Sequence, residues 1–111
     1  MKLDPFAFQH NNTVLCGVIC LPEDGRPVTG MVQTFGHGKT DVYESKSNDR
    51  FFHTLTDHGI ACCAWDRAGC GLSEGTYNHN LSPKDSGLEA AAATQEFSKR
   101  TGLPLSRIGF I

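Results

Sequence analysis

Two glycine-rich polar segments contain the residues of this sequence that are best suited to chemistry. The first is Gly36-His37-Gly38-Lys39, which follows an apolar run over residues 28–35. Glycines around a short polar loop let backbone N–H groups point at a ligand oxygen, and such groups can stabilise an oxyanion. The same residues also suit a tight turn between a strand and a helix. This loop alone leaves both interpretations open.

The second segment covers residues 66–75 and contains a Gly-x-Ser-x-Gly pattern centred on Ser73. That pattern surrounds the nucleophile of many serine hydrolases, where the serine lies on a sharp turn from strand to helix. Ser73 instead lies seven residues beyond Asp66 and is followed by a loop, with His79 as the only nearby base. We therefore predict that Ser73 is not a nucleophile.

The cysteines and the remaining histidines do not form a metal-binding pattern. Five cysteines, two of them adjacent at Cys62-Cys63, are typical of reduced thiols that pack as small apolar groups. Zinc binding would require a second pair of ligands, and Cys16-x3-Cys20 has none at Cys-x2-Cys or His-x3-His spacing. The other histidines show no shared spacing: His10, His53, His58 and His79. We predict no metal site.

Apolar periodicity predicts a β-hairpin followed by alternating strands and helices. Period-two alternation indicates strands over residues 6–8 and 14–21, joined by a turn at residues 10–12. Further strands are expected over residues 28–35, 60–65 and 108–111, and helices over residues 49–58 and 82–100. This order, without a repeat or internal linker, predicts one α/β unit with a parallel sheet.

Both polar segments follow strands of this predicted sheet. The run at residues 60–65 is continuously apolar, which is typical of a parallel strand covered on both faces. The two segments should therefore leave the carboxyl ends of adjacent strands, where ligands bind in open α/β sheets.

Composition excludes several other classes of protein. Ten basic against 12 acidic residues give a net charge of −2, which does not favour binding to nucleic acid or to a membrane surface. The longest apolar run, residues 14–21, is shorter than the roughly 20 residues of a membrane-spanning helix. The first residues do not form a secretory signal, so we predict a cytoplasmic protein.

Taken together, the two segments and their spacing resemble the α/β-hydrolase superfamily. The matching residues are His37-Gly38, Gly59-Ile60 and the Asp-Arg-x-Gly-x-Gly-x-Ser pattern at residues 66–73, and the match continues through Asp85 and residues 90–93 and 107–110. The leading hairpin with Leu21-Pro22 is most similar to the esterase and serine-peptidase-like branch. The resemblance covers nearly the whole chain and implies the N-terminal portion of an α/β-hydrolase sheet.

The resemblance also implies roles for individual residues. The oxyanion-hole donor would be the backbone N–H of Gly38 or Lys39. Residues that shape the loops would be His37, Asp66, Gly69, Gly71 and Ser73. Asp66 would do so by accepting backbone hydrogen bonds from the loop that follows it, rather than by acting as a catalytic acid. The nucleophile would follow the strand at residues 107–111, and the acid and histidine would come later. No member of the catalytic triad is therefore expected within residues 1–111, and the chemistry would need no cofactor.

The last residues, 108–111, form an apolar strand that should be central and covered in such a sheet. We therefore expect residues 1–111 to be the first part of a single, larger α/β-hydrolase domain that ends before the nucleophile. The complete protein would hydrolyse a small-molecule ester or amide, and this chain alone would be inactive.

Two other classes of protein are alternatives to this interpretation. The chain could be a non-catalytic interaction piece that another chain, or a second copy, completes through the exposed edge at residues 108–111. A small nucleotide-binding domain is disfavoured, because Gly69-Cys70-Gly71 lacks the third glycine at the required spacing and no helix follows at once.

Overall fold

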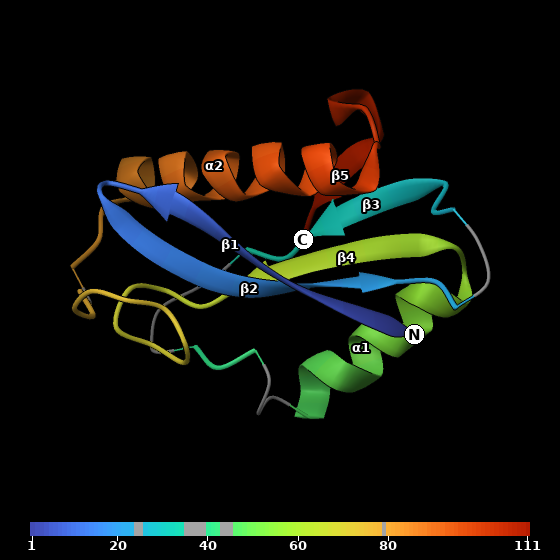
Figure 1. The fold of residues 1–111 in the computed structure, drawn as a ribbon, viewed down its shortest axis with the longest axis horizontal. Coiled ribbons are helices and arrows are strands. Elements are labelled where there is room, and N and C mark those ends of the chain that lie inside the picture. Colours follow the sequence, from blue (N-terminus) through green and yellow to red (C-terminus); the bar gives the residue numbers. More distant parts are fainter. Residues whose placement is uncertain (24–25, 35–39, 43–45, 79) are drawn as a thin grey trace.

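A five-stranded sheet with one helix on each face forms the core of the computed structural model, which describes residues 1–23, 26–34, 40–42, 46–78 and 80–111 (Figure 1). The strands are β1 (Lys2–His10), β2 (Thr13–Leu21), β3 (Thr29–Val32), β4 (Ile60–Trp65) and β5 (Ile108–Phe110). The helices are α1 (Lys46–Asp57) and α2 (Pro83–Thr101), with a short 3-10 turn at Leu105–Arg107.

The sheet is mixed, with strand order β1-β2-β4-β3-β5. β1 and β2 form an antiparallel hairpin, and β2 also pairs antiparallel with β4. β3 lies between β4 and β5 and is parallel to both. The predicted α/β unit is confirmed, but the leading hairpin joins the parallel strands in antiparallel orientation, so the sheet is not parallel throughout.

The turn between β1 and β2 has the backbone that a two-residue hairpin requires. Asn11 and Asn12 have φ angles of 51° and 59°, which asparagine tolerates better than most residues. Positive φ at both positions matches the right-handed twist of the flanking strands. The predicted turn chemistry is therefore confirmed.

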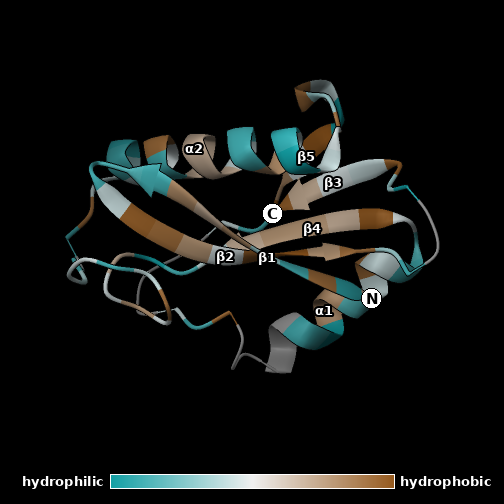
Figure 2. Ribbon diagram, in the orientation of Figure 1, coloured by the Kyte–Doolittle hydropathy of each residue, from teal (hydrophilic) through white to brown (hydrophobic). Residues whose placement is uncertain are grey.

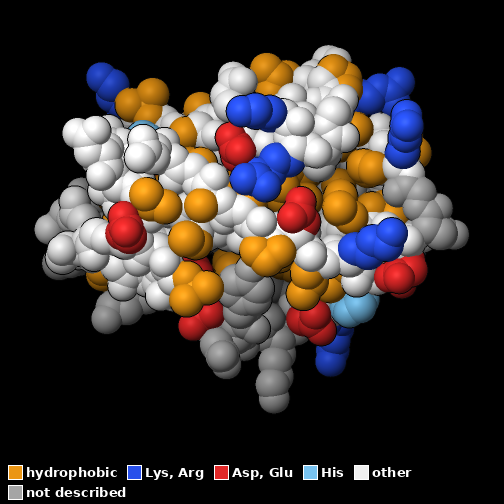
Figure 3. Space-filling model, viewed as in Figure 1, with side chains coloured by type: hydrophobic (Ala, Val, Ile, Leu, Met, Phe, Trp, Pro, Cys, Tyr) orange, Lys and Arg blue, Asp and Glu red, His pale blue; other side chains and the backbone are white. Residues whose placement is uncertain are grey.

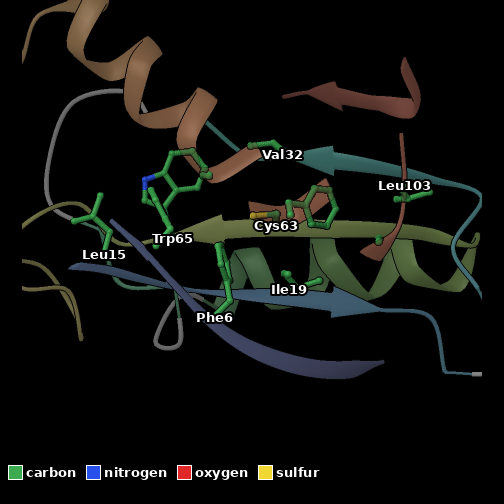
Figure 4. Packing of buried hydrophobic residues seen from close by; sticks show 11 residues of the cluster. Phe6, Leu15, Ile19, Val32, Cys63, Trp65 and Leu103 are labelled. Carbon is green, nitrogen blue, oxygen red and sulfur yellow. The ribbon is translucent and has the colours of Figure 1, made fainter. Parts of the chain in front are cut away.

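β4 is buried on both faces, as its apolar sequence predicts. Figure 2 shows that β2 and β4 are the most continuously hydrophobic strands. One side of β4 and the inner side of α2 share a cluster of buried residues: Phe6, Phe8, Leu15, Ile19, Val32, Ala61, Cys63, Trp65, Ala93, Phe97 and Leu103 (Figure 4). The cluster on the opposite face, with α1, contains Val18, Cys20, Val42, Phe52, Cys62 and Ala64.

Both ends of α2 have the capping residues expected from the sequence. Ser82 Oγ accepts a hydrogen bond from Asp85 N at 3.1 Å, and Pro83 occupies the first helical position. Gly102, with φ of 76°, ends the helix and donates its N–H to Ser98 O. One inward position was not predicted: Glu89 is buried beside Ala93 and Phe97.

β5 lies at an edge of the sheet. The predicted strand forms here and pairs with β3, but within the described residues its outer side pairs with no strand. Phe110 and Ile111 are 56% and 47% exposed, rather than covered. Figure 1 shows β5 at this margin.

One face of the molecule carries charged side chains of both signs. On the face seen in Figure 3, Lys and Arg side chains are interspersed with Asp and Glu. None of the helices in the described part of the chain is both long and apolar enough to cross a membrane.

The position of Phe97 yields a stability prediction. Phe97 is 0% exposed, and its ring packs directly over Gly30 of β3. Phe97→Ala should lower the free energy of unfolding by about 3–5 kcal/mol, because it removes buried contacts and leaves a cavity. Urea denaturation followed by circular dichroism would measure this loss. Gln95→Ala, at an exposed position on the same helix, should change stability by less than about 0.5 kcal/mol. Equal effects of the two substitutions would contradict the packing described.

Candidate active site

The loops after β3 and β4 leave the same edge of the sheet. β3 and β4 are parallel neighbours, with Val32 beside Cys63, so their carboxyl ends lie next to each other. The hydrogen bonding of β3 extends beyond the assigned strand, because Gln33 N donates to Cys63 O at 2.9 Å. The residues that lead into the two polar segments identified in the sequence therefore lie side by side.

The predicted oxyanion donors Gly38 and Lys39, together with His37, lie outside the described residues. Their flanks are described on both sides. On one side, Thr34 donates from its backbone N and its Oγ1 to Ile111 O, at 3.0 Å and 2.7 Å. On the other, Thr40 and Val42 contact the end of β4. The described residues on both sides of this segment are thus held in place, on one side by Ile111 after β5 and on the other by Asp66 and Arg67 after β4.

Asp66 forms the anchor on β4. Its side chain is fully buried, and Oδ1 accepts a hydrogen bond from Val42 N at 3.0 Å. The Thr40 side chain also hydrogen-bonds the Asp66 carboxylate, while Thr40 Oγ1 accepts from Arg67 N at 3.0 Å. The carboxylate therefore holds the segment that precedes α1, whereas the family pattern led us to expect contacts with the segment that follows β4.

Ser73 holds the following segment through the backbone of Asp66. Its Oγ donates to Asp66 O at 2.7 Å and accepts from Cys16 N at 2.8 Å. The hydroxyl therefore joins β2, the end of β4 and the loop after it. His79, the only base considered near Ser73 in the sequence, lies outside the described residues. The observed bonds give Ser73 a structural role, which is to hold the segment that follows β4.

Two glycines of this loop occupy positions that no side chain would fit. Gly71 has φ of 49°, and a Cβ there would lie 2.0 Å from Asp66 Oδ2. Gly69 has φ of 77°, and a Cβ would lie 2.3 Å from Tyr77 N. Left-handed backbone and close approach together require glycine at both positions.

The environment of Asp66 is unfavourable for its charge. Burial raises the pKa of the Asp66 carboxyl above its ordinary value, while the hydrogen bonds from Val42 and Thr40 oppose that shift and nearby Asp41 adds to it. Oδ2 is enclosed and has no hydrogen-bond partner among the residues that the structure describes. Desolvation thus outweighs the two hydrogen bonds, because removing a carboxylate from water disfavours its ionised form.

Three of the buried cysteines, Cys20, Cys62 and Cys63, are unsuited to nucleophilic chemistry. All five are free thiols, and four of them are buried. Burial raises the pKa of Cys20 and of Cys62 to about 12, and also raises the pKa of Cys63. A thiol with so high a pKa forms little of the reactive thiolate at neutral pH. Among the described residues, no group of three or more His, Cys, Asp or Glu side chains is placed to hold a metal ion.

Thr40 and Val42 were not identified from the sequence as parts of this site. They are 26 and 24 positions away from Asp66, and only the packing of the loop against β4 brings them together. The available signal in the sequence was Asp66 itself, a carboxylate at the end of a buried strand. A buried carboxylate needs hydrogen-bond donors. That signal does not say which segment supplies them.

Comparison with solved structures shows the α/β-hydrolase fold. The α/β hydrolase GrgF from Penicillium sp. sh18 superposes with a TM-score of 0.75 at 17% identity, over 99% of this chain and 37% of that one. A cold-adapted esterase from an Arctic intertidal metagenomic library gives 0.69 at 19% identity, over 96% of this chain and 47% of that one. The esterase Pf2001 from Pyrococcus furiosus gives 0.68 at 18% identity, over 98% and 40%.

This chain therefore spans less than half the length of these structures. The expected fold is confirmed, with agreement over almost all of the chain's own length. The sequence matches no protein-family model and no curated protein in the comparison.

The raised pKa of Asp66 predicts a specific pH dependence. A group whose pKa is higher in the folded state contributes stability that is fully present below its unfolded-state pKa. That contribution is lost as pH rises through the folded-state pKa. Asp66→Asn keeps an acceptor for Val42 N–H but cannot ionise. The free energy of unfolding of the Asp66→Asn protein, measured relative to that of the wild type, should therefore increase as the pH rises above about 4. This pH is near the ordinary pKa of aspartate.

Urea denaturation of both proteins from acidic to neutral pH would measure this difference. Asp57→Asn, at an exposed position on α1, is the matched control and should follow the wild-type profile. A stability difference between the Asp66→Asn variant and the wild type that stays constant with pH would contradict the effect of burial.

Proposed function

We propose that this chain forms the N-terminal part of a serine hydrolase that cleaves small-molecule carboxylic esters or amides. The nucleophile, acid and histidine would be provided outside residues 1–111. In this proposal the chain supplies the oxyanion loop and the sheet that holds it, and it is inactive alone. The backbone N–H of Gly38 or Lys39 would stabilise the oxyanion of the tetrahedral intermediate.

The observation that carries this proposal is the anchoring of the loop after β3 to the end of β4. Oxyanion donors act only when they are held in place before the reaction begins, since otherwise part of their effect is lost in ordering the loop. Asp66 Oδ1 bonds Val42 N at 3.0 Å, and Arg67 N bonds Thr40 Oγ1 at 3.0 Å. These bonds lie just beyond the predicted donors in the chain and would fix one end of their loop.

The hydrogen bonds of Ser73 support the proposal that this serine is not the nucleophile. Its Oγ already makes hydrogen bonds to Asp66 O and Cys16 N, and the residue is only partly exposed. An activated serine instead needs a base within hydrogen-bond reach and a path for the acyl group. Because two of the structures with a similar fold are esterases, carboxylic esters are included among the proposed substrates.

A covalent-labelling experiment tests whether residues 1–111 contain a nucleophile. The purified chain should give no turnover of an activated aryl ester above the buffer rate. A fluorophosphonate probe, which labels activated serines, should leave Ser73 unmodified in a mass-spectrometric digest. Ser73→Ala should lower stability by about 1–3 kcal/mol, because two backbone groups lose their partner, without changing the rate of ester hydrolysis.

The matched control for Ser73→Ala is Ser86→Ala, at a partly exposed position near the start of α2. Labelling of Ser73, or turnover that disappears in the Ser73→Ala protein alone, would overturn the assignment. The coding sequence downstream of residue 111 gives an independent test. The proposal expects it to encode a Gly-x-Ser-x-Gly pattern within a few residues.

The exposed margin of β5 favours a second candidate function, in which another chain completes the sheet. β5 pairs with β3 on one side only among the described residues, and Phe110 and Ile111 are about half exposed. An unpaired edge offers backbone donors and acceptors to an added strand. The added strand could come from a second copy of this chain or from a different protein.

Size-exclusion chromatography with light scattering tests this second candidate. Self-association through β5 should make the apparent mass depend on concentration. Phe110→Lys, which places a charge on the exposed edge, should shift the chain towards the monomer. Leu3→Lys, at an exposed position on the opposite edge strand, is the control and should leave the association unchanged. A monomer at every concentration, with protected amides in β5 by hydrogen exchange, would contradict association through this edge.

A further inference from the structure

Two neighbouring cavities lie between the end of β4, the turn between β1 and β2, and the first turns of α2. Their volumes are about 150 Å³ and 180 Å³. Arg67, Leu81 and Glu89 line both of them. Trp65 lines the smaller cavity, and Tyr77 lines the larger one. The two cavities therefore share one buried glutamate and one buried arginine.

Glu89 has an acceptor oxygen that is free to bind a ligand. The residue is only 6% exposed, and Oε1 accepts a hydrogen bond from Trp65 Nε1 at 2.7 Å. Figure 4 shows the Trp65 indole extending from β4 towards α2, the helix that carries Glu89. Oε2 makes no hydrogen bond with any described residue, yet it is not enclosed in the way that Asp66 Oδ2 is. This oxygen therefore has open space beside it.

The walls of the cavities favour an uncharged ligand with an apolar body. Arg67 and Glu89 bring opposite charges to the same walls, so an ion of either sign gains little net attraction for its loss of hydration. The indole of Trp65 and the side chains of Leu81 and Ala90 supply apolar surface in the smaller cavity. A cavity of about 150 Å³ has room for a benzene ring.

We propose that these cavities bind a small uncharged ring compound whose hydroxyl group donates a hydrogen bond to Glu89 Oε2. Phenol is the simplest such compound. The ring packs against Trp65 and Leu81, and the hydroxyl donates to the oxygen for which the described residues provide no donor. This site goes beyond the proposed hydrolysis, because it uses residues outside the oxyanion loop. Its binding is measured without turnover, so failure of one proposal leaves the other standing.

Titration of the chain with phenol and with toluene tests the proposal. The two ligands have nearly the same shape, and only phenol can donate a hydrogen bond. Trp65 is the only tryptophan of the chain, so its indole N–H signal in a nuclear magnetic resonance spectrum reports on the cavity. Phenol should shift this signal and bind roughly 10- to 100-fold more tightly than toluene, the range expected for a hydrogen bond to a charged group.

Glu89→Gln keeps an acceptor for Trp65 but removes the ionised oxygen. This variant should bind phenol at least about tenfold more weakly, with toluene binding unchanged. Glu96→Gln, at a partly exposed position on the same helix, is the matched control and should bind both ligands as the wild type does. Ala90→Leu fills the smaller cavity and should abolish binding of both ligands while the circular dichroism spectrum is kept.

Several results would overturn the proposal. They are equal affinity for phenol and toluene, tighter binding of benzoate than of phenol, no binding to the wild type, and unchanged phenol binding in a folded Glu89→Gln protein. If Glu89→Gln does not fold, the comparison of phenol with toluene and the Ala90→Leu variant still decide the question.

Discussion

The burial of Asp66 at the end of β4 is the constraint on which the arrangement of this sheet edge depends. Its carboxylate has no exposure to water, so its ionised form must be compensated by donors that the surrounding chain brings to it. Val42 N and Thr40 provide them from the loop before α1, and the backbone carbonyl of Asp66 binds Ser73 on the other side. One residue thus fixes the positions of two loops, and Gly71 leaves the space that its second oxygen occupies.

The elements of the fold could be predicted from the sequence because local chemistry specifies them. Alternation of apolar residues predicts β2, and Asn11 with Asn12 predicts the turn before it. Ser82 and Gly102 mark the two ends of α2 by capping interactions that span only a few residues. The continuous apolar run of β4 already indicates burial on two faces. Each of these signals lies within the element that it predicts.

The contacts that build the site could not be predicted in this way. Asp66 and Val42 are 24 positions apart, and the sequence around either residue does not identify the other as its hydrogen-bond partner. Glu89 shows the same limit, because a glutamate on a helix is expected to face water. It is buried because Trp65, also 24 positions away, presents an indole N–H that needs an acceptor. The antiparallel pairing of β2 with β4 likewise depends on how the hairpin docks rather than on its own pattern.

The two margins of the sheet differ in a way that bears on assembly. β1 forms one margin and contains Pro5, whose ring nitrogen carries no hydrogen and thus offers no donor to an incoming chain. β5 forms the other margin, where glycine and apolar residues keep their amide groups. The two margins therefore differ in the donors that they offer to an added strand, because the β1 margin lacks the N–H of Pro5 and the described β5 margin contains no proline.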